Sequence, residues 1–345
     1  MIRFGIVGTG PFCRESHILS IITAGEEITA IYNRGEDNRV EALKMISEAG
    51  GEPEILSDPH AVCSHPDVDA VLLCVPPSLF PGLIHTAVWS GKHIFCEKPL
   101  AANINDALRI VQSVSHAKTV FHVGFVIRFS NIFQELMKIL QSGAVGTPKQ
   151  VWCRCYSNSI WPYRTDSWVN DETSSGGSLN SWAVHAFDLM QAMAGGYPVR
   201  CNGVGGHMAR ENTALTDGAY IGVEYSSGAI GSLQLCRYAP RGDDWMIGCI
   251  GTEGMVEAGY FTGTLYLRHT ADDSFEQVQV PDYGHHSFDG MQQQMDIFVD
   301  ACENAGSTGC GYREGYYATA LAISAEKAVR SRKTIDIPHI EEVTT

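Results

Sequence analysis

The chain has 345 residues, more than the roughly 250 to 300 at which one hydrophobic core usually stops growing, so two domains are expected. Its 39 acidic and 24 basic residues give a net charge of -15 without a basic stripe, which excludes nucleic acid as a partner because a phosphate backbone would be repelled. No apolar run approaches the roughly 18 residues of a membrane-spanning helix, and the N-terminus enters a strand without a basic leader, so no membrane association is expected.

The first 124 residues alternate between short apolar runs and helical patterns. The apolar runs predict strands at residues 2–7, 28–32, 70–75, 93–96 and 120–123. Apolar residues at helical spacing predict helices over residues 39–49, 79–90 and 104–115. Alternating strands and helices build βαβ units with right-handed crossovers, so we predict an α/β fold with a doubly wound parallel sheet over residues 1–124.

The pattern changes near residue 125. After a predicted helix at 131–142 and a turn at 143–148, alternating residues predict strands at 150–156, 220–225, 229–236, 246–250 and 264–268. Hairpin turns are predicted at 226–228 and 251–254, and helices at 179–194, 289–304 and 312–332. Residues 125–345 are therefore expected to form an α+β domain with a large, open, mixed or antiparallel sheet.

A glycine turn directly follows the first predicted strand. Gly8 permits a tight turn, and Gly10 lets the backbone approach a pyrophosphate at the start of the next helix, where unpaired N–H groups favour an anion. Thr9, Pro11 and Phe12 complete the loop. The third glycine of the dinucleotide-binding fingerprint is missing, so an ordinary strand-to-helix turn is the alternative, but the position in a βαβ unit favours a nucleotide site.

The end of the second predicted strand indicates which nicotinamide cofactor is bound. NAD enzymes usually place an acid there to bind the ribose hydroxyls, whereas this chain has Asn33 and Arg34. Asn33 can hydrogen-bond ribose oxygens, and Arg34 can pair with a 2′-phosphate or stack on adenine. We therefore expect NADP to be preferred, with NAD possible. The alternative is that Arg34 is a solvated loop cation while Glu36 or Asp37 contacts the ribose.

Two further strand ends are predicted at the same edge of the sheet. Val75 and Pro76 close the strand at 70–75, either as a wall beside the nicotinamide or as a plain strand terminator. The next strand runs into Glu97, Lys98 and Pro99, which puts Glu97 and Lys98 beside the cofactor. Most lysines face solvent, but one pinned by a proline at this edge is a candidate for proton transfer.

A second polar cluster follows the glycine pair at residues 176–177. Ser181, His185 and Asp188 fall on one stripe of the predicted helix at 179–194, with Asp188 within reach of the His185 ring. A histidine with an acid one turn away is a plausible proton-transfer group. The alternative is a structural histidine beside an apolar face.

At these residues the chain resembles the glucose-fructose oxidoreductase and inositol dehydrogenase (Gfo/Idh/MocA) family over nearly its whole length. The motifs are the glycine turn followed by His17, the Glu-Lys-Pro at 97–99, the Gly-Phe-x-x-Arg-Phe at 124–129, the helix entry leading to His185 and Asp188, and residues 288–298. The resemblance implies a Rossmann domain, a second domain whose open sheet mediates dimer or tetramer formation, and hydride transfer with sugars, polyols or their derivatives. It also implies that Lys98 and His185 are the acid/base pair that contacts the substrate.

Two positions depart from the family pattern. Many relatives carry an aspartate where this chain has Ser181, so His185 is expected to be less strongly held as an imidazolium, leaving more of the proton transfer to Lys98 or Tyr163. His17 also stands one residue further from the glycines than is usual, which predicts a differently shaped loop.

The loop at residues 161–168 combines aromatic and polar side chains that suit a sugar, including Tyr163 and Arg164. The alternative is that its aromatics pack on their own domain. Arg128, Ser181, Lys98 and His185 complete the expected substrate contacts. The pair at 285–286, two histidines, has no carboxylate or cysteine at a metal-ligand spacing, so no metal is expected.

We therefore interpret the chain as an NADP- or NAD-dependent oxidoreductase acting on a carbohydrate or polyol alcohol or its ketone. A sensor of sugars or nucleotides that kept the fold, and an enzyme that uses tightly bound NAD to cleave a glycosidic bond, are the alternatives. The eleven cysteines lie mostly in apolar strands without CxxC spacing, which favours reduced thiols and a cytoplasmic location.

Overall fold

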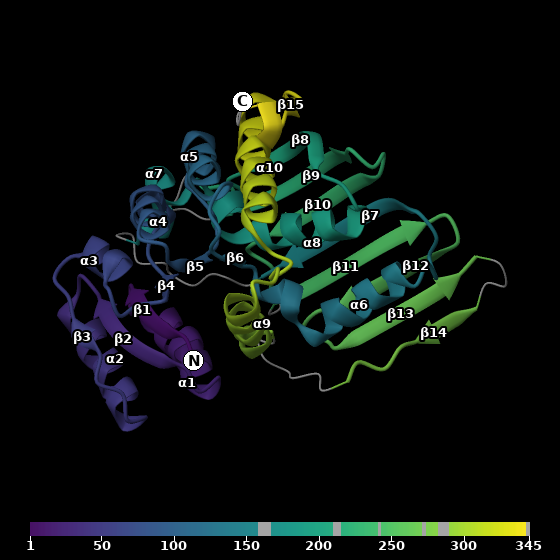
Figure 1. Ribbon diagram of the computed structural model, residues 1–345. Coiled ribbons are helices and arrows are strands. Elements are labelled where there is room, and N and C mark those ends of the chain that lie inside the picture. The colour runs from purple at the N-terminus through teal and green to yellow at the C-terminus, as the bar shows by residue number, and fades with distance from the viewer. Residues whose placement is uncertain (158–166, 210–214, 241–242, 271–273, 282–289, 343–345) are drawn as a thin grey trace.

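The computed structural model describes residues 1–157, 167–209, 215–240, 243–270, 274–281 and 290–342, and it divides into two sheets that lie side by side (Figure 1). Tyr163, Arg164 and the two histidines at 285–286 lie outside the described residues. No helix of the described part is long and apolar enough to cross a membrane.

The N-terminal sheet has six parallel strands in the order β3-β2-β1-β4-β5-β6. Their bounds are β1 Arg3–Val7, β2 Glu27–Tyr32, β3 Glu54–Ile55, β4 Ala70–Leu73, β5 His93–Glu97 and β6 Phe121–Gly124. Apolar side chains alternate between its two faces, because successive residues of a strand point to opposite sides. Leu73 packs towards α4 (Phe80–Trp89) and α5 (Ile104–Val114), and Leu72 packs towards the opposite helices. The predicted doubly wound sheet is confirmed.

The helices on that opposite face are α1 (Leu19–Thr23), α2 (Glu36–Glu48) and, from the far end of the chain, α9 (Met291–Asn304). Phe298 of α9 lies against the rings of Phe4 and Phe95, at centroid distances of 6.1 and 5.4 Å. A segment from the C-terminal part of the chain therefore completes the core under the first strands. The remaining helix of this domain, α3, spans Pro59–Ser64.

The second sheet has nine strands in the order β14-β13-β12-β11-β7-β10-β9-β8-β15, and it is mixed because β7 and β10 pair in parallel while their other neighbours are antiparallel. Its bounds are β7 Pro148–Tyr156, β8 Pro198–Gly206, β9 Gly218–Tyr225, β10 Ile230–Cys236, β11 Asp244–Gly251, β12 Gly254–Gly259, β13 Thr264–His269, β14 Phe275–Gln277 and β15 Ile335–Asp336. This confirms the predicted large, open, mixed sheet.

One face of this sheet is covered by α6 (Asn131–Gln141), α8 (Val184–Ala194) and α10 (Tyr312–Ser331), which Figure 1 shows as a layer in front of the strands. Helix α10 also contacts α5, so it bridges the two sheets. Short helical turns, η2 (Pro77–Leu79), η3 (Val126–Phe129), η4 (Trp168–Asn170) and η6 (Ile340–Glu342), and α7 (Glu172–Ser175) complete the connections.

Strand β8 was not predicted from the sequence. It contains Gly203, Gly205 and Gly206 and so lacks the alternation of apolar side chains that marks a strand. A Cβ on Gly203 or Gly205 would come within 2.9 or 2.3 Å of a backbone oxygen of β9, so the glycines allow a close approach of the two strands. The pairing of β8 with β9 is thus a tertiary requirement that the local pattern does not show.

Candidate active site

The glycine turn after β1 has the geometry of a phosphate-binding loop. Gly8 has φ +95°, its N–H donates to Tyr32 O at 2.8 Å, and an added Cβ would lie 2.3 Å from Cys74 O, so only glycine is tolerated there. At Gly10 a Cβ would meet nothing within 4 Å. Open space therefore lies beside Gly10, at the start of a helix, where a pyrophosphate fits. Pro11 is exposed and Phe12 is half-buried at this entry.

Asn33 is committed to shaping this loop. Its Oδ1 accepts the N–H of Thr9 at 3.0 Å, and its Nδ2 donates to Gly35 O at 2.7 Å. The Thr9 side chain is fully buried and donates to Asn38 O at 3.1 Å, so Thr9 stabilises the turn from inside. The neighbouring Arg34 is exposed and lies at the mouth of the loop.

Sequence reasoning missed Arg14, which reinforces the same loop. Its Nη1 donates to Thr9 O at 2.9 Å and to Asn38 Oδ1 at 2.8 Å. Arg14 follows the glycines in the first helix, where the fingerprint specifies no residue, so only the folded loop reveals its contacts. Arg14 therefore supports the candidate phosphate-binding turn from the helix that follows it.

A π-helical turn, η1 (Cys13–Ile18), follows the loop and brings His17 inside. A π-turn accommodates one extra residue, which accounts for His17 standing one residue further from the glycines than is usual in the family. The His17 ring is fully buried, and its Nε2 lies 2.8 Å from Glu97 Oε1. The other oxygen, Oε2, accepts the backbone N–H of Lys98 at 3.1 Å. Glu97 therefore joins the glycine-loop helix to the end of β5.

Val75 and Pro76 follow β4 at the same edge as the glycine loop. Both are half-buried, and a Cβ on Gly8 would come within 2.7 Å of Val75 Cγ1. The structure thus brings the ends of β1, β4 and β5 together at the carboxyl edge of the sheet, where ligands bind in doubly wound folds.

Lys98 reaches from the N-terminal sheet to the second domain. Its Nζ donates to the backbone oxygen of Ser181 at 3.2 Å, and its peptide bond to Pro99 is cis. Burial lowers the pKa of Lys98, the charge of Glu97 opposes this shift, and the charge of Arg237 adds to it. Lys98 is half-buried and lies between two domains, in a position from which it can donate to a ligand oxygen.

Ser181 lies in a second π-helical turn, η5 (Leu179–Ala183), which leads into α8 and His185. The Ser181 hydroxyl is 3.5 Å from Ser178 O, so the contact with Lys98 is made by its main chain. This turn brings Lys98 and the helix of His185 together.

His185 is half-buried, with its ring edge-on to Phe125 at a centroid distance of 5.8 Å. Its Nδ1 has no hydrogen-bond partner among the described residues. Burial, and then the charge of Lys98, lowers the pKa of His185 well below its usual value, so the ring is neutral near pH 7. A neutral imidazole beside a lysine can accept a proton.

The prediction that Asp188 lies beside the His185 ring is wrong. Asp188 is fully buried and binds Arg128, whose Nη2 and Nε lie 2.5 and 2.9 Å from its two carboxylate oxygens. A planar guanidinium offers two parallel donors to a carboxylate, which an imidazole cannot do, so Arg128 takes the acid. Arg128 thereby ties the η3 turn to α8, and its expected contact with the substrate stays a prediction.

Two buried polar residues hold the helix of His185 in place. Asn180 donates from Nδ2 to Ala101 O and to Ser175 O, both at 2.8 Å, and so links the segment after Pro99 to η5. Glu326 of α10 accepts the N–H of Leu179 and the hydroxyl of Thr216, both at 2.8 Å. These contacts fix His185 relative to Lys98.

Sequence reasoning also missed Arg237, which follows β10. This side chain is 1% exposed, its Nη1 donates to Ser178 Oγ at 2.8 Å, and its guanidinium lies 5.3 Å from the Trp182 ring. A lone arginine after a strand carries no signal in the sequence; the contact with η5 appears only in the fold. Among the described residues, no group of three or more His, Cys, Asp or Glu side chains is arranged to hold a metal ion.

The comparisons with known proteins agree with this geometry. Residues 2–125 match the model of the oxidoreductase family with an NAD-binding Rossmann fold (Gfo/Idh/MocA), and residues 133–257 match its C-terminal domain. The myo-inositol 2-dehydrogenase of Thermotoga maritima is 24% identical over 343 residues, covering 98% of this chain and 99% of the relative. The inositol 2-dehydrogenase 1 of Saccharopolyspora erythraea is 26% identical, covering 97% and 96%.

Among solved structures, levoglucosan dehydrogenase in complex with NADH and L-sorbose superposes with a TM-score of 0.89 at 20% identity, covering 99% of this chain and 100% of that one. A putative myo-inositol dehydrogenase from Sinorhizobium meliloti 1021 superposes with a TM-score of 0.80 at 22% identity, covering 98% of this chain and 100% of that one. These likenesses establish a shared fold. Two matched domain models, and a Rossmann sheet whose strand β5 runs into the Glu-Lys-Pro segment, show that the chain belongs to the Gfo/Idh/MocA family and is an oxidoreductase with an NAD-binding domain.

Proposed function

We propose that this oxidoreductase transfers hydride to or from a sugar, a polyol or a sugar derivative, with Lys98 and His185 as its acid/base pair. The observation that carries the proposal is the meeting of Lys98, from the end of β5, with the turn that leads to His185, through the 3.2 Å bond to Ser181 O. The names of the relatives, inositol dehydrogenases and a levoglucosan dehydrogenase, support a polyhydroxylated substrate.

In the oxidation direction, His185 accepts the hydroxyl proton of the substrate while the carbon-bound hydrogen leaves as hydride. Its neutral ring suits this role, because burial and Lys98 hold its pKa low. Lys98 donates a hydrogen bond to the reacting oxygen and stabilises the charge that develops there. In the reduction direction, His185 returns the proton to the same oxygen. The nicotinamide cofactor, when bound, supplies the hydride acceptor or donor.

The residues present fit a dinucleotide, since Gly8 fixes the turn and open space lies beside Gly10. Gly8, Thr9, Gly10, Pro11 and Phe12 would hold the pyrophosphate, and Val75, Pro76, Glu97 and Lys98 would lie on the nicotinamide side. NADP is preferred in this proposal. Position 33 carries an amide where NAD enzymes usually place a carboxylate, and the exposed Arg34 offers a cation to a 2′-phosphate.

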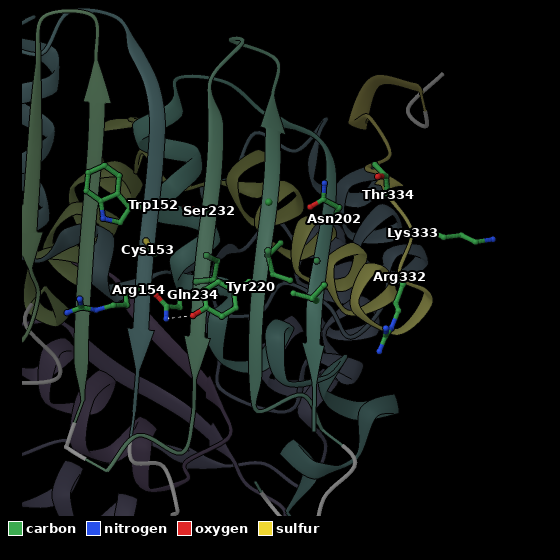
Figure 2. Close-up of a pocket in the computed structure, with 15 residues that line it drawn as sticks. Trp152, Cys153, Arg154, Asn202, Tyr220, Ser232, Gln234, Arg332, Lys333 and Thr334 are labelled. Atoms are coloured by element: carbon green, nitrogen blue, oxygen red, sulfur yellow. Dashed lines mark hydrogen bonds between the residues drawn. The ribbon is translucent and has the colours of Figure 1, made fainter. Parts of the chain in front are cut away.

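Self-association through the open face of the second sheet is part of the proposal. Figure 2 shows this face, where Trp152, Arg154, Tyr220 and Gln234 stand on the side of the strands away from the helices. Tyr220 is 60% exposed, and a groove of about 590 Å³ runs along this face. A second copy would cover these side chains, as expected of exposed apolar patches. Light scattering at micromolar concentration tests this: a dimer or tetramer supports it and a monomeric mass contradicts it.

The proposal divides the chain at Gly124 into a cofactor-binding domain, residues 1–124, and a substrate-binding and oligomerisation domain, residues 125–345. Tyr163 and Arg164 belong to the proposed substrate contacts with Ser181. We also propose a cytoplasmic location, which the eleven free cysteines support, because reduced thiols are typical of that compartment.

A panel of sugars, inositols and sugar acids, assayed with both cofactors at the nicotinamide absorbance, tests the function. Substrate-dependent absorbance change with stoichiometric cofactor turnover is the expected result. Binding without any absorbance change would point to a sensor. Glycosidic-bond cleavage without net cofactor turnover would point to elimination through transient oxidation.

A further inference from the structure

The buried pair of His17 and Glu97 takes no part in the proton transfer described above, yet it joins the two ends of the candidate active site. His17 belongs to the turn that follows the glycine loop, and Glu97 immediately precedes Lys98. One carboxylate oxygen faces His17 Nε2 at 2.8 Å, and the other accepts the Lys98 N–H at 3.1 Å. The Glu97 side chain is therefore held at both oxygens.

The surroundings of this pair leave little room for movement. The His17 ring is packed edge-on against Phe12 and Phe95, with centroid distances of 5.5 and 5.1 Å. Glu97 Oε1 lies against Gly124, where an added Cβ would come within 2.6 Å of it. These close neighbours and the two hydrogen bonds, to His17 and to the Lys98 backbone, together fix the orientation of the Glu97 carboxylate.

The proton of His17 can be placed from its partners. Nε2 faces the carboxylate, whereas Nδ1 has no hydrogen-bond partner among the described residues. Carboxylate oxygens accept hydrogen bonds, so the ring places an N–H on Nε2 and donates it to Glu97. His17 is therefore the donor of this pair.

We propose that His17 is a positioning residue for Lys98, acting through Glu97. By donating to Glu97, it holds this buried carboxylate in place, and Glu97 in turn anchors the Lys98 backbone and supplies a negative charge near the Lys98 ammonium group. The first turn of the cofactor-side helix thereby sets the position and the charge of the residue on the substrate side. This inference rests on the proposed role of Lys98.

Among the charges around Lys98, that of Glu97 raises the pKa of Lys98 most. Within the described part of the chain, the charged and titratable groups that face Lys98 or Glu97 include His17, Cys74, Cys96, His185 and Arg237, and His122 lies near His17. Burial lowers the pKa of Lys98 most, Arg237 lowers it further, and Glu97 opposes both. Without the charge of Glu97 at this position the opposition is lost, so Lys98 titrates at lower pH.

The test measures Lys98 directly, without a substrate. The full-length protein is labelled with acetic anhydride across a pH series, and acetylation of Lys98 is quantified by peptide mass spectrometry against the exposed Lys118. Glu97→Gln should lower the midpoint of the Lys98 titration by about one pH unit or more, the scale for removing a neighbouring opposite charge. His17→Leu should shift it in the same direction.

His17→Gln, whose amide can still donate to Glu97, should keep the wild-type midpoint, as should the control His116→Gln at an exposed position. An unshifted midpoint in Glu97→Gln, or in a folded His17→Leu, would overturn the proposal. Equal shifts in His17→Gln and His17→Leu would overturn it too, because the donor would then be irrelevant. If His17→Leu fails to fold, the other two variants decide. Turnover by Lys98→Met is a separate result that bears on the proposed function alone.

Discussion

Replacing Ser181 by aspartate should move the acidic limb of the pH–rate profile to higher pH. Ser181 lies four residues before His185, in the π-helical turn that leads into α8, and we take a separation of about 6 Å between a carboxylate there and the imidazole. At an effective dielectric constant of about 20, this pair interacts by about 3 kcal/mol, or about 2 pKa units. Solvent at the half-buried His185 reduces the effect, so a shift of about 1 to 2 units is expected.

The sign follows from the role of His185. The ring accepts a proton only when neutral, and its pKa is lowered, so the acidic limb of oxidation by the wild-type enzyme should lie below pH 6.5. A carboxylate stabilises the imidazolium and raises this pKa, so Ser181→Asp loses activity at a higher pH than the wild type. The assay is kcat/KM for oxidation from pH 5 to 9, with Ser181→Asn as the uncharged control. Superimposable acidic limbs for the aspartate and asparagine variants would refute His185 as the base.

Three further results are expected. Arg34→Ala should weaken the binding of NADP(H) by about 1 to 3 kcal/mol in a fluorescence titration and leave the binding of NAD(H) unchanged. Equal losses of affinity for the two cofactors would refute the proposed contact between Arg34 and the 2′-phosphate. Asp188→Asn should lower the free energy of unfolding in urea by about 3 to 5 kcal/mol, because it leaves the Arg128 guanidinium buried without its carboxylate. The double variant Arg128→Met with Asp188→Leu should recover most of this free energy. A single variant as stable as the wild type would contradict this expectation. Gly8→Ala should lower both thermal stability and cofactor affinity, because its Cβ would meet the backbone. Gly10→Ala should lower cofactor affinity alone, since its Cβ meets no protein atom. An equal loss of thermal stability in the two variants would argue against the open space beside Gly10.

Much of the fold follows from local patterns that the sequence displays. Strands such as β4 and β5 are continuous apolar runs because both their faces are covered, and the end of β5 marks Lys98 for the crevice. Helix α5 ends one residue before its predicted bound, because its buried residues recur at helical spacing. The predicted helix at 179–194 ends at the same residue as α8, but its first five residues form the π-helical turn η5 instead.

The partners of polar side chains could not be predicted in the same way. Helical spacing puts Asp188 near His185, but spacing does not reveal that Arg128 arrives from another segment with a better geometry for the acid. The two π-helical turns are likewise invisible to a periodicity of 3.6 residues, although the extra residue before His17 was a sign of one. Arg14 and Arg237 carry no motif, and only the folded loops bring them to the site.

Lys98→Met tests the central claim most directly. The methionine keeps the length of the side chain while removing the amine that reaches Ser181 O, so folding and cofactor affinity should stay close to wild type. On the substrate that the panel identifies, kcat should fall by about 100-fold or more, the usual scale for removing an acid/base group. Near-wild-type turnover by Lys98→Met would contradict the account and leave the chemistry to another residue.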